Sequence, residues 1–143
     1  MSPEIRVSAV VVTDPSGRAL VVRKHGTAVF QQPGGKPDPG ETPLDAAVRE
    51  LLEETGIVAD PASFAPLGLF RDAAANEPGH TVVADAFGLV LPTAEAVAGA
   101  EIAELRWIGA DDMDATPLAP LSRNQLLPLA WRSPAPGLSG LRR

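Results

Sequence analysis

The opening third of the chain alternates between apolar runs and turn-forming residues. Residues 5–13, IRVSAVVVT, are rich in β-branched side chains and predict a strand. Asp14, Pro15 and Gly17 then supply turn chemistry, because proline fixes φ and glycine permits a positive φ. Residues 19–24, ALVVRK, predict a second strand. We therefore expect these two strands to form a hairpin.

The segment that follows changes from a loop pattern to a helical one. Residues 31–41, QQPGGKPDPGE, contain three prolines and three glycines and predict no regular element. Residues 43–55 have apolar side chains at helical spacing, which predicts one buried stripe. The stripe consists of Leu44, Ala47, Val48, Leu51 and Leu52. Thr42 is a favoured N-cap before Pro43, and Gly56 is a favoured terminator, so both helix ends are specified.

The rest of the chain predicts more strands and a short last helix. The expected strands are 64–70, weakened by Pro66, then 80–91 and 104–109, with a turn at 75–80 and a loop at 109–120. Residues 122–131 predict the helix. Ser122 and Gln125 match a capping box, but Pro128 would then lie too deep in the helix. We therefore expect this helix to begin near Asn124 or later, and residues 132–143 to be a frayed tail.

Element order and composition together predict one α/β domain over residues 1–143. A hairpin followed by interleaved helices and strands favours a mixed sheet with helices on its faces. A chain of 143 residues with a hydrophobic fraction of 45% can bury a single core. The absence of cysteine excludes disulfides, thiolate metal sites and a cysteine nucleophile.

Charge and the first apolar run limit the classes of partner. The net charge of −6 argues against a surface for duplex nucleic acid, which requires a broad basic stripe. The apolar run before Asp14 is too short for a signal peptide or a membrane span. We therefore expect a cytoplasmic protein without a membrane partner.

Three glutamates crowd into little more than one turn of the predicted helix. Glu50 and Glu54 border the apolar stripe, and like charges at this spacing cost a few tenths of a kcal/mol per pair. Arg49 is four residues from Glu53 and can hold its carboxylate. Carboxylates at this density suit Mg²⁺ or Mn²⁺ together with phosphate oxygens. The alternative is a solvated acidic helix face.

The loop before the helix favours the metal and phosphate interpretation. Gly34 and Gly35 allow close approach of the backbone to a ligand. Lys36 adds a cation beside them, and Glu41 closes the loop.

The glycine, arginine and glutamate spacing of residues 35–57 resembles the Nudix box. All specified positions of that signature are filled, from Gly35 and Glu41 through Arg49, Glu50, Glu53 and Glu54 to Gly56 and Ile57. The resemblance implies an α/β/α sandwich with a mixed central sheet. It also implies Mg²⁺- or Mn²⁺-dependent hydrolysis of a nucleoside diphosphate linked to another group.

The resemblance assigns roles by position. Glu50 and Glu54 would be metal ligands, and Gly34 would offer its carbonyl oxygen. Glu53 would be a ligand or would orient the attacking water, with Arg49 fixing it. Glu41 would support the loop or contact a metal through water. The general base of the family varies, so Glu101 and Glu104 on a later segment are further candidates.

Other residues are candidates for binding the substrate. Arg23, Lys36 and Arg71 are cations that could contact phosphate oxygens. Phe30, Gln31 and Gln32 could line a base pocket, or Phe30 could be core and the glutamines surface residues. Asn124 could contact a base edge, or could simply cap the last helix.

Three functions remain compatible with the sequence. The compact length and the VFQQPGGKPDPGE segment resemble the MutT-type group of the family, which implies a pyrophosphohydrolase of nucleoside triphosphates, including oxidised ones. The second possibility is an ADP-ribose or nucleotide-sugar pyrophosphatase, although the downstream markers of several subgroups are missing. The third is a non-catalytic nucleotide sensor. Dimers are common among similar proteins, but nothing in the sequence marks an interface.

Overall fold

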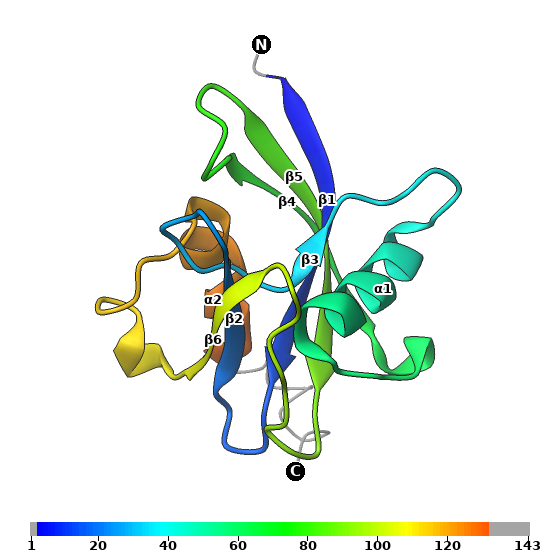
Figure 1. Cartoon of the computed structure of the whole chain (residues 1–143), viewed down its shortest axis with the longest axis vertical. Helices are drawn as coiled ribbons and strands as arrows, with labels where there is room; N and C mark the ends of the chain where they lie inside the picture. The colour runs from blue at the N-terminus through cyan, green and yellow to red at the C-terminus, as the bar shows by residue number, and fades with distance from the viewer. Residues whose placement is uncertain (1–2, 132–143) are drawn as a thin grey trace, which may run out of the picture.

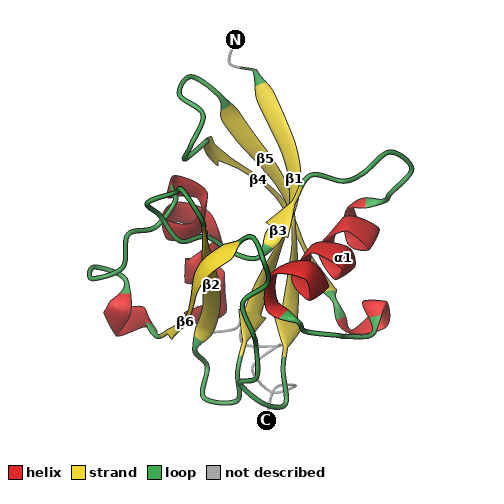
Figure 2. Cartoon of the chain, viewed as in Figure 1, coloured by secondary structure: helices red, strands yellow, loops and turns green. Residues whose placement is uncertain are grey.

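A mixed β-sheet forms the middle layer of the molecule, with helices on both faces (Figures 1 and 2). The computed structural model describes residues 3–131, so the predicted frayed tail, 132–143, lies outside the described residues. The strands are β1 (Glu4–Thr13), β2 (Ala19–Lys24), β3 (Gly34–Gly35), β4 (Ala65–Ala73), β5 (Thr81–Val90) and β6 (Ile102–Ile108). Their order is β4-β5-β1-β2-β6, with β3 paired to β1. Only β1 and β5 pair in parallel among these strands, so the predicted mixed sheet is confirmed.

The helical segments lie between β3 and β4 and after β6 in the sequence. They are α1 (Pro43–Thr55), η1 (Pro61–Ser63), η2 (Ala110–Asp112), η3 (Ser122–Leu126) and α2 (Leu127–Trp131). Among the described residues, no helix has the length and apolar character needed to cross a membrane.

The opening hairpin forms as predicted, but its two strands soon part. Thr13 faces Ala19 across the turn, and the Asp14 carboxylate accepts hydrogen bonds from the backbone of Ser16 and Arg18 at 2.9 Å each. Beyond this point β3 pairs with β1 in place of β2 (Figure 1). The prediction that 31–41 contains no regular element was therefore wrong at two residues.

Glycine makes the insertion of β3 possible. A Cβ atom on Gly34 would lie 2.0 Å from the backbone oxygen of Ser8, which is far inside van der Waals contact. Any side chain would push β3 away from β1. The Gly34–Gly35 pair thus brings the loop backbone against the centre of the sheet.

Alternate residues of β1 pack against opposite helical layers, as a period of two requires. Val10 and Val12 belong to the cluster beneath α1, which also contains Ala47 and Leu51. Ala9 and Val11 belong to the cluster on the other face, with Leu121 and Leu126. The α/β/α arrangement predicted from the sequence is therefore confirmed.

Helix α1 has the predicted ends but a rotated buried face. Thr42 and Asp45 form a capping box, and Gly56 terminates the helix at φ 71°. Leu52, which the sequence placed in the apolar stripe, is 48% exposed. Glu54 is buried instead, because the helix turns this edge toward β3.

The last helix begins earlier than predicted. Pro120 and Leu121 are already helical, and η3 is a π-helical turn in which the N–H of Leu127 reaches the carbonyl oxygen of Ser122. A π turn shifts the register of backbone bonds by one residue. This turn ends at Leu126, two residues before Pro128, which has no N–H to donate. The predicted capping box is absent, since the Ser122 hydroxyl binds Gln32 instead.

The second strand has the predicted bounds, 19–24, whereas each of the other predicted strands has at least one boundary shifted by one to three residues. Strand β4 continues to Ala73, beyond the predicted end at residue 70. Pro66 is tolerated because β4 lies at the edge of the sheet and its register shifts between Pro66 and Gly68.

Candidate active site

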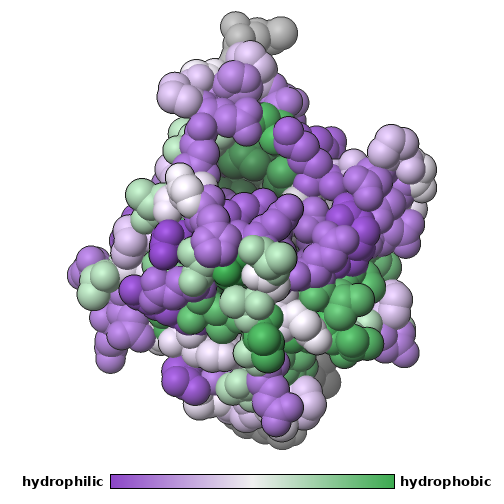
Figure 3. All heavy atoms as spheres, in the orientation of Figure 1, coloured by the Kyte–Doolittle hydropathy of each residue, from purple (hydrophilic) through white to green (hydrophobic). Residues whose placement is uncertain are grey.

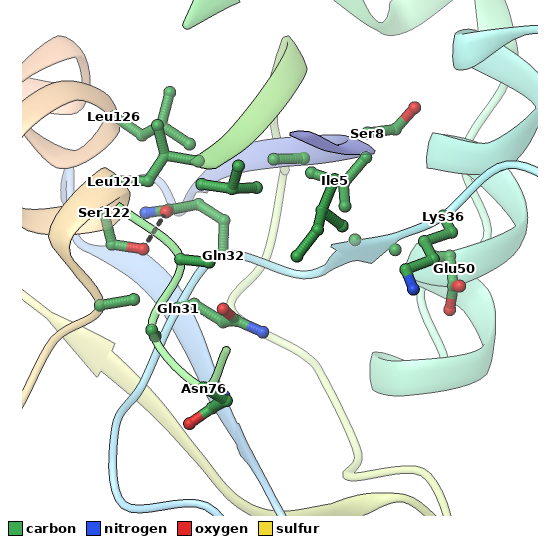
Figure 4. A pocket seen from close by; sticks show the side chains of 18 of the residues that line it. Ile5, Ser8, Gln31, Gln32, Lys36, Glu50, Asn76, Leu121, Ser122 and Leu126 are labelled. Carbon is green, nitrogen blue, oxygen red and sulfur yellow. Dashed lines mark hydrogen bonds between the residues drawn. The ribbon is translucent and has the colours of Figure 1, made fainter. Parts of the chain in front are cut away.

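A cleft of about 460 Å³ runs across the first half of β1, from α1 to η3. Its apolar floor includes Ile5, Val7 and Val82, and residues 73–77 form part of its rim. Figure 3 shows a hollow with hydrophobic atoms inside and hydrophilic atoms around it. Figure 4 shows Lys36 and Glu50 on the side of α1, opposite Gln32, Leu121, Ser122 and Leu126. One end of the cleft is thus charged and the other mainly apolar.

Glu54 is the most deeply buried carboxylate at the charged end. Its side chain is 2% exposed, and its Oε1 accepts a hydrogen bond from the Gly34 N–H at 3.2 Å. Its Oε2 is buried without a hydrogen-bond partner and lies 3.9 Å from Lys24 Nζ. Burial raises the pKa of Glu54 to about 8, outweighing the opposing effect of Lys24.

Glu50 lies directly over β3. A Cβ atom on Gly35 would be 2.1 Å from Glu50 Oε2, so the carboxylate occupies the space that a side chain would need. Burial raises the pKa of Glu50, although the nearby Arg49 guanidinium opposes the shift. The absence of a side chain at Gly35 therefore fixes where this carboxylate can lie.

Arg49 connects the acidic residues to the glycine-rich loop. Its Nε and Nη2 donate to the two oxygens of Glu41 at 2.7 and 2.9 Å, and Nη2 also reaches the Lys36 carbonyl oxygen at 3.2 Å. Its Nη1 donates to Glu53 Oε1 at 3.2 Å and lies 3.3 Å from Glu50 Oε2. The hydrogen bond from Arg49 lowers the pKa of Glu41 to about 2.

The predicted metal ligands lie close together but do not form a complete coordination site. The Glu53 side chain is 58% exposed on the Arg49 side of the helix. Across residues 3–131, no three aspartate, glutamate or histidine side chains converge as a cation site. The metal roles of Glu50, Glu53, Glu54 and the Gly34 carbonyl remain predictions. The unpartnered Glu54 Oε2 beside Glu50 nevertheless fits a hard divalent cation, which prefers carboxylate oxygen.

The two later glutamates occupy different environments. Glu104 bonds Arg106 Nε at 2.8 Å and lies 3.7 Å from Arg23, and the Arg106 bond lowers its pKa. Glu101 is exposed, and its charge raises the pKa of Glu54. Its backbone oxygen accepts from the His25 N–H at 3.0 Å, next to Lys24. Glu101 is therefore the better placed of the two to act near the box carboxylates.

Of the predicted substrate contacts, the structure brings Lys36, Gln31 and Gln32 to the cleft. Arg23 instead donates to the Thr27 carbonyl oxygen at 3.0 Å, and Arg71 pairs with Glu4.

Two further candidates lie away from the cleft lining. Asn124 donates to Asp72 at 3.0 Å. Phe30 is 1% exposed in the core beneath Arg106, whose guanidinium carbon lies 4.5 Å from the ring centroid.

Several cleft residues were not predicted from the sequence. Lys24 belongs to a basic segment with Arg23 and His25 that could hold phosphates, but the sequence did not single it out, and Ser122 was predicted only as a cap. Strand alternation could have separated Lys24 from Arg23, since neighbours on a strand point to opposite faces. No local signal placed Ser8 or residues 73–77 at the cleft, because they come from other strands and a distant hairpin.

Known proteins with similar sequences share one domain type. Residues 3–129 match the family model described as NUDIX domain. A Bacillus subtilis protein named "Putative 8-oxo-dGTP diphosphatase" is 34% identical over 99 residues, covering 69% of this chain and 62% of the relative. "Phosphatase NudJ" of Escherichia coli K12 is 44% identical over 64 residues, covering 43% of this chain and 40% of the relative. The matched regions thus span less than two thirds of these relatives.

Solved structures with the same fold support the architecture. A MutT protein from Methanosarcina mazei has a TM-score of 0.73 at 20% identity, over 92% of this chain and 95% of that chain. The NUDIX domain of Shewanella oneidensis NrtR, solved with ADP ribose, has a TM-score of 0.75 at 16% identity, over 92% and 90% of the two chains.

Proposed function

The chain belongs to the NUDIX domain family, and from this premise we propose that it is a nucleotide pyrophosphohydrolase. The proposed substrate is a nucleoside triphosphate, including an oxidised one, which water converts to a nucleoside monophosphate and pyrophosphate. The name of the Bacillus subtilis relative supports this substrate class.

The two-ended cleft is the observation that carries the proposal. Its charged end contains Lys24, Lys36 and Glu50 beside the Gly34–Gly35 backbone, and its other end is bordered by Leu121 and Leu126. A nucleoside triphosphate has the same division between a charged chain and a flat, largely apolar base. One volume of about 460 Å³ spans both environments, as expected for a small-molecule site.

The carboxylates at the charged end fit a divalent cation, proposed to be Mg²⁺ or Mn²⁺. Glu54 and Glu50 would hold it, with the Gly34 carbonyl and Glu53 as further candidate ligands. When bound, such an ion neutralises phosphate charge and lowers the pKa of water.

The protein side chains contribute positioning and proton transfer. Lys24 and Lys36 are cations on the cleft wall and would hold phosphate oxygens. Arg49 fixes Glu41 and the helix edge that carries Glu53. Glu53 or Glu101 would accept the proton of the attacking water, since both are exposed carboxylates close to the charged end.

A substrate panel tests the proposal directly. Purified protein is incubated with Mg²⁺ and dNTPs, 8-oxo-dGTP, ADP-ribose or nucleotide sugars, and pyrophosphate and phosphate release are measured. We expect pyrophosphate from one or more triphosphates and no activity in EDTA. Glu50→Gln should raise the Mg²⁺ concentration that gives half the maximal rate.

Other outcomes would identify the alternatives. Formation of AMP and ribose phosphate from ADP-ribose, without triphosphate cleavage, would replace the proposal with an ADP-ribose pyrophosphatase. Tight nucleotide binding without turnover of any compound would indicate a sensing module.

A further inference from the structure

The side-chain amide of Gln32 is an unexplained polar group at the apolar end of the cleft. The residue is 5% exposed, and its Nε2 is buried without a hydrogen-bond partner. Its Oε1 accepts a hydrogen bond from the Ser122 hydroxyl at 2.6 Å, drawn as a dashed line in Figure 4. Ser122 is itself 1% exposed. The pair therefore links the loop before β3 to the last helix.

An unpartnered donor in this position costs stability. A buried amide hydrogen without an acceptor is disfavoured, because it has lost its hydrogen bond to water and gained none in the protein. The surrounding cleft residues Ala119, Leu121 and Leu126 have no side-chain acceptor to offer. Groups of this kind are uncommon in folded proteins and call for an explanation.

We propose that Gln32, oriented by Ser122, selects nucleotides whose base carries a carbonyl oxygen at its inner edge, in particular 6-oxopurines over 6-aminopurines. The proposal rests on the proposed function, because it assigns the base end of the same cleft. It makes Gln32 a specificity-determining residue and Ser122 a positioning residue.

The hydrogen bond from Ser122 determines which part of the amide is available. A glutamine contacts adenine best with both ends, since its oxygen accepts from N6 and its nitrogen donates to N7. Here the Ser122 hydrogen bond occupies one of the two lone pairs of the oxygen and holds the oxygen against the last helix, so the two hydrogens of Nε2 are the unused part of the amide. A 6-oxopurine offers acceptors at O6 and N7, and therefore matches a group that only donates.

The proposal requires the buried amide hydrogens of Gln32 to turn toward a bound base. The last torsion of a glutamine side chain is broad rather than confined to narrow wells. In the proposed complex, rotation about this torsion turns the amide hydrogens toward the bound base. The base would lie over the apolar floor, with its phosphates toward Lys24 and Lys36.

Binding of IMP and AMP tests the inference without turnover. These nucleotides differ at position 6 of the base, and isothermal titration calorimetry measures their affinities. We expect IMP to bind about tenfold more tightly than AMP, corresponding to about 1.4 kcal/mol. Gln32→Met should abolish the preference by weakening the binding of IMP. Ser122→Ala should reduce the preference by strengthening the binding of AMP, because Oε1 is no longer held toward Ser122 and can turn to accept from N6.

A matched control and a double variant separate recognition from folding. The control is Gln125→Met, because Gln125 lies in η3 with Ser122 but outside the cleft, where it donates to the Arg71 carbonyl oxygen. The preference for IMP should persist in this variant. Gln32→Met combined with Ser122→Ala makes both partners apolar, which is nearly neutral for stability. This folded double variant should still lose the preference.

Equal affinity of the unmodified protein for the two nucleotides, or no binding of IMP, would overturn the inference. So would a preference that survives in the folded double variant. Turnover is measured separately with ITP and ATP. If the protein prefers IMP but hydrolyses neither ITP nor ATP, only the proposed function is refuted. If it hydrolyses ITP and ATP equally well and binds IMP and AMP equally tightly, only the base selection is refuted.

Discussion

Replacing Gly35 with alanine should displace the Glu50 carboxylate while leaving the fold intact. The new Cβ would lie 2.1 Å from Glu50 Oε2 and 2.6 Å from its Cδ. Both atoms are at the end of a flexible side chain, so the helix backbone does not have to move. Gly35 is not among the glycines with positive φ, so alanine fits its backbone conformation.

The size of the effect follows from the required movement. Ordinary contact begins at 3.4 Å, so Oε2 must retreat by about 1.3 Å. A misplacement of about 1 Å can lower a rate by about 10²-fold, which corresponds to about 2.7 kcal/mol in the barrier. Stability should change little, because alanine stabilises by about 0.4–1 kcal/mol through the unfolded chain and this offsets the cost of moving Glu50.

The assay compares kcat, the Mg²⁺ dependence and Tm for Gly35→Ala, Glu50→Gln and the double variant. If Gly35→Ala acts through Glu50, it should lower kcat by about 10²-fold alone but add little in the Glu50→Gln background. We expect Tm to shift by no more than about 4 °C. Gly109→Ala is the control, since its Cβ would meet only Asp112 at 3.8 Å.

Two results would refute this reasoning. A folded Gly35→Ala protein with an unchanged rate and metal dependence would show that the position of the Glu50 carboxylate does not matter. Full additivity of the two substitutions would show that Gly35 acts through something other than Glu50.

The remaining predictions concern the other glutamates. Glu53→Gln should lower kcat by about 10²-fold or more, as expected for loss of an acid–base group; a near-normal steady-state rate would exclude it from the mechanism. Glu101→Gln should lower kcat/KM more than Glu104→Gln, because Glu104 is paired with Arg106 and Arg23, and the reverse order would identify Glu104 as the functional group. In EDTA, Tm should fall as pH rises from about 5 to about 8. Glu54, with its pKa raised from 4.5 to about 8, binds more protons when folded than when unfolded across this window. Its contribution to stability is therefore complete below the unfolded pKa and is lost progressively as the pH rises through the folded pKa. Glu54→Gln should flatten that slope, and a slope that persists would show that another group causes it.

The sequence predicted the local elements well because their signals are contained within short segments. The capping residues Thr42 and Asp45, Pro43 and Gly56 fix α1 through contacts inside the helix and its ends. Turn chemistry at residues 14–18 fixes the opening hairpin. The box spacing also identified Glu50, Glu54 and Arg49 as a group, because helical spacing places them on adjoining edges.

The last helix shows where local reasoning was insufficient. Ser122 has the composition of a cap, yet its hydroxyl is used by Gln32, ninety residues away in the chain. Pro128 was expected to delay the helix, but a π turn accommodates it. Neither choice could be read from residues 122–131 alone, since both depend on packing against the sheet.

The sequence by itself determined the family signature, the ends of α1 and the residue types available for phosphate and metal chemistry. Only the tertiary structure decided that Glu54 is buried without a partner for Oε2, that Lys24 rather than Arg23 faces the cleft, and that Glu104 is paired away. The physical reason is the range of the interactions. Caps and turns act over a few residues, whereas burial, pKa shifts and the cleft itself arise where distant strands and helices meet.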